Sequence, residues 1–103
     1  MGLFGSLIGK KSNSSSELLE KIQAGAMVFD VRGPGEFKEG HYPKAVNIPV
    51  DKVQARIGEF GPKDKTVIVY CLSGARSAMA AKLLRAAGYV DVVNAGGLGD
   101  MPA

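Results

Sequence analysis

The chain contains one cysteine, Cys71, in a setting that favours a reactive thiolate. It follows an apolar, mostly β-branched run at residues 66–70 and is separated by one short loop from a helical pattern. The start of a helix presents unpaired backbone N–H groups and the positive end of the helix dipole, and both favour the thiolate over the thiol. Gly74 lets the loop backbone curl so that successive N–H groups turn toward one anion, and Arg76 can add a positive charge. These features predict a nucleophilic cysteine inside an anion-binding loop.

A lone cysteine in apolar surroundings is more often an inert core residue. Here the strand end, the glycine, the helix start and the arginine occur together, and that combination favours a functional cysteine. The candidate site has Cys71 as the nucleophile, Leu72, Ser73, Gly74, Ala75 and Arg76 as the substrate- and anion-binding loop, and Asp30, Arg32 and Ser77 as supporting residues.

The residues around this loop are interpreted first as structural. Asp30 and Arg32 flank the end of a strand, and we expect an ion pair that anchors the loops in preference to direct contact with substrate. Ser77 can cap the following helix or hydrogen-bond the sulfur, and capping is the favoured role. Glu36 and His41 are expected to pin a long loop, because a solitary histidine is usually a hydrogen-bonded structural residue.

The composition narrows the possible functions. With 103 residues, 46% hydrophobic residues and 22% charged residues, the chain is expected to form one globular domain with a modest core. The net charge of +3 is scattered and tryptophan is absent, which disfavours nucleic-acid binding. One cysteine and one histidine exclude a disulfide framework and a multi-cysteine metal site, and no apolar run is long enough for a transmembrane helix. We predict a protein of a reducing compartment, the cytoplasm.

The elements that must position the site follow from periodicity and punctuation. Ser14 and Glu17 form a capping-box pattern at the start of a helix, and Gly25 ends that helix. The further expected elements are strands at 27–31, 45–48, 66–70 and 90–93, a loop at 32–44, a helix capped by Asp51 with Val53 and Ile57 inward, and an amphipathic helix carrying Ala80, Leu83, Leu84 and Ala87. Strands that alternate with helices predict an α/β domain at residues 14–103 with a mainly parallel sheet, preceded by a mobile tail at residues 1–13.

The segment at residues 69–77 resembles the active-site loop and helix of the rhodanese family. A second stretch agrees in order and spacing: Asp30-Val31-Arg32, Glu36-Phe37, Gly40-His41-Tyr42-Pro43 and Ala45-Val46-Asn47-Ile48-Pro49. Gly88-Tyr89 and Gly96-Gly97-Leu98 also match in place, so the resemblance covers about residues 14 to 98.

The resemblance implies a three-layer α/β/α domain and sulfane sulfur transfer without a metal or organic cofactor. Cys71 would take the outer sulfur of thiosulfate, or of a persulfide or polysulfide, and hold it as a persulfide. Cyanide or a thiol would then accept the sulfur, and a sulfur-accepting protein is a further candidate partner. Because Leu72 and Ala75 are apolar, a polysulfide or persulfide is expected to be a better donor than the thiosulfate dianion.

Two other functions remain open. A small cysteine-dependent phosphatase or arsenate reductase would carry five residues between its cysteine and arginine, whereas four lie between Cys71 and Arg76 here. A non-catalytic persulfide carrier or sensor would be modified at Cys71 without appreciable turnover of small molecules. Two departures from the family pattern are Lys44, where glycine is usual, and Met101 in place of a tryptophan. From them we expect an altered loop and a C-terminal cover that is looser or provided by a partner.

Overall fold

The computed structural model describes residues 14–103, and the tail expected at residues 1–13 lies outside the described residues. The elements in chain order are α2 (Ser15–Gln23), β1 (Met27–Asp30), α3 (Pro34–Glu39), β2 (Val46–Asn47), the 3-10 turns η1 (Val50–Lys52) and η2 (Ile57–Phe60), β3 (Val67–Cys71), α4 (Ala75–Ala86), β4 (Val92–Gly97) and η3 (Leu98–Asp100). Among these residues, no helix has the length and apolar composition needed to cross a membrane.

The four strands form one sheet in the order β2-β1-β3-β4, and every pairing in it is parallel. Asp30 of β1 lies in register with Tyr70 of β3, and Cys71 lies in register with Gly97 of β4. The carboxyl ends of three strands therefore meet at one edge of the sheet, which is where open α/β sheets place their ligand sites.

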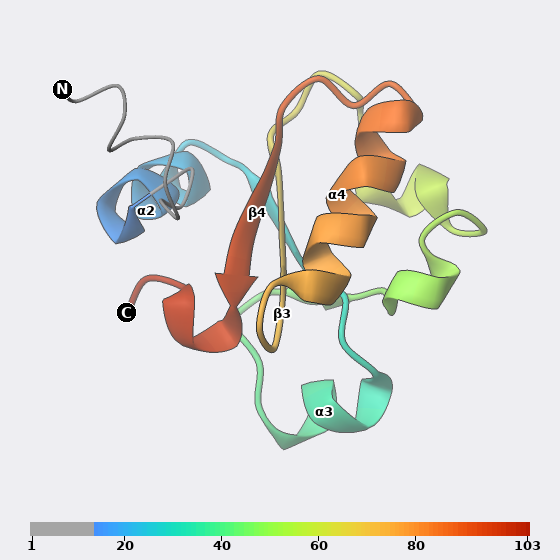
Figure 1. The fold of residues 1–103 in the computed structure, drawn as a ribbon. Helices are drawn as coiled ribbons and strands as arrows, with labels where there is room; N and C mark the ends of the chain where they lie inside the picture. The colour runs from blue at the N-terminus through green and yellow to red at the C-terminus, as the bar shows by residue number, and fades with distance from the viewer. Residues whose placement is uncertain (1–13) are drawn as a thin grey trace, which may run out of the picture.

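Alternate residues of β3 separate the core into two layers. Val67, Val69 and Cys71 pack in the apolar cluster under α4, whereas Ile68 and Tyr70 pack in the cluster under α2. Figure 1 shows α2 and α4 on opposite sides of the sheet. Full burial of one valine, isoleucine or similar apolar side chain contributes about 1.5–3 kcal/mol to the stability of the fold. The packing on the two faces of β3 therefore stabilises the positions of both helices. The expected three-layer α/β/α architecture is confirmed.

The helix start at Ser14 is confirmed in detail. The Ser14 hydroxyl accepts the Glu17 N–H at 3.2 Å, and the Glu17 carboxylate accepts the Ser14 N–H at 2.7 Å. Gly25, with φ of 107°, follows the helix end at Ala24. The reciprocal bonds satisfy two N–H groups that a helix start otherwise leaves unpaired.

Several expected boundaries are wrong. The segment 32–44 is not all loop, because α3 occupies residues 34–39, with Pro34 in its first turn and Glu36 accepting the Gly33 N–H at 3.1 Å. The helix expected after Asp51 is replaced by two short 3-10 turns, η1 and η2, and the second contains Gly58, a residue that weakens a regular α-helix. The last strand begins at Val92 and includes both glycines of the Gly96-Gly97 pair.

The two departures from the family pattern have different outcomes. Lys44 has φ of 68°, in the left-handed region that favours glycine and costs other residues about 1–2 kcal/mol. Met101 is 8% exposed and packs in the cluster under α2, so the expectation of a looser C-terminal cover is wrong. A flexible apolar side chain fills that space without an aromatic ring.

Candidate active site

The Cys71 sulfur lies at the carboxyl end of β3, directly under the first turn of α4. It accepts the Gly74 N–H at 3.0 Å and the Ser77 N–H at 3.4 Å. Gly74 precedes the helix with φ of 105°, a conformation that glycine adopts without the clash of a Cβ. This bend turns the backbone N–H groups inward onto the sulfur.

Burial and hydrogen bonding act in opposite directions on the pKa of Cys71. Cys71 is only 1% exposed, and burial raises the pKa of its thiol. Hydrogen bonds from the Ser77 hydroxyl and from the N–H groups of Ser77, Gly74 and Ser73 outweigh burial and leave the pKa below its ordinary value. The loop therefore favours the thiolate although the residue is buried.

Ser77 does not cap α4, so the expected capping role is wrong. The position before the helix belongs to Gly74, and the Ser77 hydroxyl lies inside the first turn, 3.4 Å from the Cys71 sulfur. The hydroxyl donates to Asn94 Oδ1 at 2.6 Å. The one hydroxyl proton has three possible acceptors, which are Asn94 Oδ1, the Gly96 carbonyl at 3.3 Å and the Cys71 sulfur. The shortest contact is to Asn94, so the backbone N–H groups are the more constant donors to the sulfur.

Asn94 is a site residue that sequence reasoning missed. Its Oδ1 accepts the Gly96 N–H at 3.0 Å, and its Nδ2 donates to the Gly74 carbonyl at 3.2 Å. These two bonds fix the orientation of the amide, and the amide in turn fixes the Ser77 hydroxyl. Only the register of β4 beside β3 brings Asn94 here, and nothing in its local sequence indicates this position.

The loop packs directly against the backbone of β4. A Cβ added at Gly97 would fall on the Leu72 carbonyl, and one added at Gly74 would lie 3.4 Å from the Gly96 Cα. η3 continues this wall, because the Asp100 carboxylate accepts the Gly97 N–H at 2.8 Å. The space around the sulfur is therefore closed by main chain on the β4 side.

Arg76 forms an ion pair that the sequence did not indicate. Its guanidinium donates to both carboxylate oxygens of Glu36, at 2.7 and 3.0 Å. The bond from Arg76, together with the Gly33 N–H, lowers the pKa of Glu36 to about 2. The side chains are 39% and 37% exposed, so the pair lies at the rim of the site and links α4 to α3. Forty positions separate the partners, and only the folded loop brings them together.

Asp30 and Arg32 form a second pair at the same edge of the sheet, in a buried position. The Arg32 side chain donates to both oxygens of Asp30 at 2.7–3.1 Å, and it also donates to the Gly40 carbonyl at 2.7 Å. The side chains are 6% and 0% exposed. This hydrogen bonding joins the end of β1 to the end of α3. His41 adds to this connection, because its Nδ1 lies 2.8 Å from the Phe37 carbonyl and its ring stacks on Phe37.

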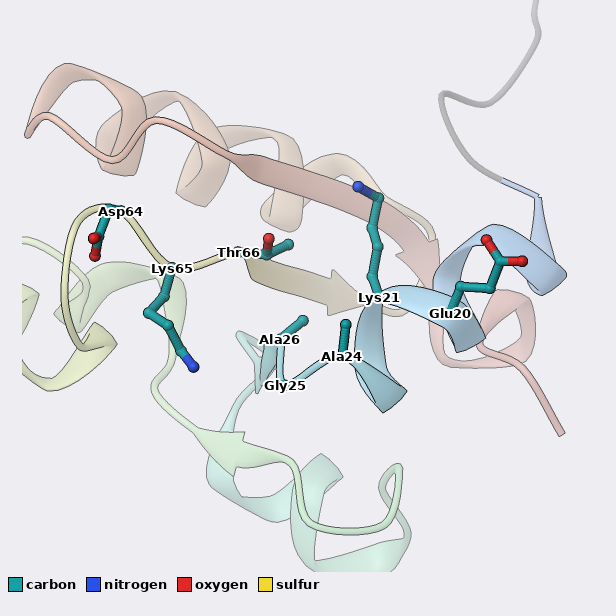
Figure 2. A pocket seen from close by; sticks show the side chains of 8 residues that line it. All are labelled: Glu20, Lys21, Ala24, Gly25, Ala26, Asp64, Lys65 and Thr66. Atoms are coloured by element: carbon teal, nitrogen blue, oxygen red, sulfur yellow. The ribbon is translucent and has the colours of Figure 1, made fainter.

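Two hollows lie at opposite ends of the sheet. One of about 300 Å³ opens beside the Cys71 loop and is lined by Arg32, Glu36, Glu39, Gly40, Leu72 and Leu98. A larger one, of about 400 Å³, lies where α2 ends and β1 and β3 begin, and Figure 2 shows its mixed lining of lysine and acidic side chains. No residue of the candidate site lines the larger hollow, so the candidate site is identified by its chemistry and not by the size of a hollow.

The structure thus brings Cys71, Ser73, Gly74 and Ser77 together around the sulfur and holds Arg76 at the rim. Leu72, Ser73 and Ala75 are exposed residues of the loop, and Ser73 reaches the sulfur through its backbone N–H. Asp30 and Arg32 form a buried pair at the end of β1. The arrangement can stabilise a sulfur anion at Cys71.

Comparison with known proteins agrees with this geometry. The family model described as "Rhodanese-like domain" matches residues 14–99. The thiosulfate sulfurtransferase PspE of Escherichia coli K12 is 44% identical over 74 residues, which is 71% of this chain and 71% of that protein.

Solved structures show the same fold. A structure titled "rhodanese with anions from E. coli" has a TM-score of 0.71 at 41% identity, covering 76% of this chain and 95% of that one. The human single-domain sulfurtransferase TSTD1 has a TM-score of 0.75 at 28% identity, covering 86% and 91%. The chain therefore belongs to the rhodanese family of sulfurtransferases.

Proposed function

We propose that the protein transfers a sulfane sulfur through a persulfide formed on Cys71. In the first half-reaction the Cys71 thiolate attacks the outer sulfur of the donor. A new S–S bond forms, the donor's own bond to that sulfur breaks, and its electron pair leaves with the donor remnant. From thiosulfate the leaving group is sulfite, and from a persulfide it is a thiolate.

The observation that carries this proposal is the convergence of backbone N–H groups on the Cys71 sulfur. The Gly74 and Ser77 N–H groups are already directed at it, so little rearrangement is needed to stabilise the thiolate. The first N–H groups of a helix have no intrahelical acceptor, which leaves those of Ala75 and Arg76 as donors to the outer sulfur of the persulfide.

The depth of the sulfur also supports this chemistry. With Cys71 1% exposed, a bulky electrophile has little access to it, whereas a single projecting sulfur atom can enter the loop. Four residues between Cys71 and Arg76, and the backbone contact between Leu72 and Gly97, favour a narrow anion over tetrahedral phosphate or arsenate.

In the second half-reaction a thiophilic acceptor removes the outer sulfur. Cyanide or a thiolate attacks that sulfur, the S–S bond to Cys71 breaks, and the electron pair returns to Cys71 as thiolate. A sulfur-accepting protein can play the same part. The cycle needs a free thiolate, so a reducing compartment such as the cytoplasm is the location we propose.

The test is to detect the persulfide on the intact protein. Incubation with thiosulfate or glutathione persulfide is expected to add one sulfur, about 32 Da, and cyanide is expected to remove it as thiocyanate. Cys71→Ser should gain no sulfur while keeping its circular dichroism spectrum. Ser16→Ala, on the exposed surface of α2, is the matched control and should load like the wild type.

Each alternative function has its own outcome. The proposal is wrong if no sulfane donor produces an adduct, or if Cys71→Ser is loaded as fully as the wild type. Hydrolysis of a phosphate ester without an adduct would support the phosphatase. Loading without turnover toward cyanide or thiols would identify a carrier.

A further inference from the structure

The mouth of the Cys71 loop is not a cationic site, although two arginines lie beside it. Arg32 is engaged by both oxygens of Asp30, and Arg76 is engaged by both oxygens of Glu36. Glu39 adds a carboxylate to the hollow beside the loop, which Arg32 and Glu36 also line. These residues together carry three carboxylates against two guanidinium groups, before the thiolate of Cys71 is considered.

Glu36 offsets the charge of Arg76 throughout the neutral pH range. Its carboxylate stays ionised, because the Arg76 guanidinium and the Gly33 N–H lower its pKa to about 2. The two contacts of 2.7 and 3.0 Å also direct the guanidinium toward α3. Arg76 is therefore held by a protein anion at the place where a substrate anion would need it.

We propose that Glu36 is a specificity-determining residue, which disfavours the thiosulfate dianion and makes an organic persulfide the preferred sulfur donor. This inference rests on the proposed sulfur transfer at Cys71. Thiosulfate brings two negative charges toward a thiolate and a net acidic rim, whereas the persulfide group of an organic thiol carries at most one. Repulsion of the donor scales with its charge, so the dianion is affected more strongly.

The apolar part of the hollow fits the same donor class. Leu72 is 64% exposed, and together with Leu98 it lines the hollow beside the loop. Carbon groups of an organic persulfide can pack on these side chains, while the sulfonate end of thiosulfate gains nothing from them. The charge and the apolar surface thus select in the same direction.

The favoured loading step is balanced without any co-reactant. The Cys71 thiolate attacks the outer sulfur of R–S–SH, the donor S–S bond breaks, and R–S⁻ leaves with the electron pair. Cys71 then holds –S–SH, and no oxidant or reductant is consumed.

The direct test is Glu36→Gln. Glutamine keeps an oxygen for the Gly33 N–H but removes the charge that neutralises Arg76. Single-turnover loading of Cys71 is followed by quenching and intact mass, with thiosulfate and with 2-mercaptoethanol persulfide as donors at equal ionic strength. The second-order rate constant with thiosulfate is expected to rise about fivefold, and that with the persulfide to change less than about twofold.

Two further variants show whether the gain comes from the charge of the Glu36–Arg76 pair. Glu59 forms a similar bidentate pair with Arg56, at 2.8 and 2.9 Å, on a separate turn. Glu59→Gln removes the same charge from the protein and is expected to leave both rate constants within about twofold. Arg76→Gln alone leaves the Glu36 carboxylate at the rim without its partner cation, so loading from thiosulfate is expected to slow about tenfold while loading from the persulfide changes less.

The outcomes separate this inference from the proposed function. If the wild type loads sulfur but Glu36→Gln slows both donors equally, Glu36 only positions the loop and the inference is wrong. An equal gain in Glu59→Gln, or an equal slowing of both donors in Arg76→Gln, would also overturn it. If the wild type accepts sulfur from neither donor, the proposed function itself fails.

Discussion

Two arginine–carboxylate pairs stand at the same edge of the sheet, and their surroundings differ sharply. Asp30–Arg32 has side chains that are 0% and 6% exposed, whereas Glu36–Arg76 has side chains that are 37% and 39% exposed. In both pairs the guanidinium donates to both carboxylate oxygens, through three hydrogen bonds in the buried pair and two in the exposed pair. Loss of either partner of the buried pair lowers stability strongly, because the other partner remains as an unpaired charge shielded from water. The exposed pair can open at small cost in stability, which makes it available to respond to a substrate.

The comparison shows that similar bonding geometry does not imply a similar role. Arg32 also donates to the Gly40 carbonyl, and Asn47 donates to the carbonyls of Asp30 and Arg32, so the buried pair belongs to a network that fixes α3 beside β1. Glu36 lies on α3, so its position at the rim depends on that network. The buried pair thus fixes the position of α3, and α3 in turn positions Glu36 in the exposed pair.

The largest effect on stability is expected from Arg32→Ala. It would leave the Asp30 carboxylate buried without its partner, and we expect a loss of about 3–5 kcal/mol in the free energy of unfolding. Urea denaturation measures this loss. Arg56→Ala breaks the exposed Arg56–Glu59 pair and should cost less than about 1 kcal/mol. Similar losses in both variants would contradict the distinction between buried and exposed pairs.

Arg76→Ala is expected to act on chemistry more than on the fold. The change removes a cation at the rim and leaves Glu36 unneutralised, so thiosulfate loading of Cys71 should slow about tenfold. The free energy of unfolding should change by less than about 1 kcal/mol, because the pair is exposed. Single-turnover mass spectrometry and urea denaturation on the same preparation measure both quantities. A loss of stability large enough to account for the slower loading would show that Arg76 supports the fold and not the chemistry.

The smallest effect concerns acid stability and depends on Glu36. Its pKa is about 2 in the folded protein against an ordinary value of 4.5, so the folded state binds fewer protons between these values. The resulting stability is present above about pH 4.5 and is lost as the pH falls toward about 2. Between about pH 6 and about pH 3, the urea midpoint of Glu36→Gln should therefore fall less than that of the wild type. Equal declines would show that this pair contributes nothing measurable.

The sequence predicts the parts of the molecule that depend on local pattern. The capping box at Ser14, the buried strand before Cys71 and the following amphipathic helix all leave signals within a few residues. The cysteine loop itself was predicted from the same kind of signal. α3 was missed because Gly33 and Gly35 suggest a loop, although Pro34 followed by Glu36 is also a helix-start pattern.

Contacts between distant segments could not be predicted in this way. Glu36 meets Arg76 across 40 positions, and Asn94 meets Ser77 across 17, through the packing of α3 and β4 around the loop. The role of Ser77 was wrong for a related reason. A serine near a helix start usually caps it, but the left-handed turn at Gly74 takes that position and moves Ser77 inside. Local patterns identified the nucleophile, and the tertiary fold supplied the groups that tune it.

The missing side chain at Gly97 has a consequence for redesign. The Leu72 carbonyl occupies the place that a Cβ of residue 97 would take, so the loop is in direct contact with the peptide backbone of β4. A longer segment between Cys71 and Arg76, introduced to accommodate a bulkier oxyanion, would clash with the backbone of β4 before it widened the anion-binding loop. Converting this protein to ester hydrolysis would also require displacing the end of β4, so the loop and the end of β4 would have to be redesigned together.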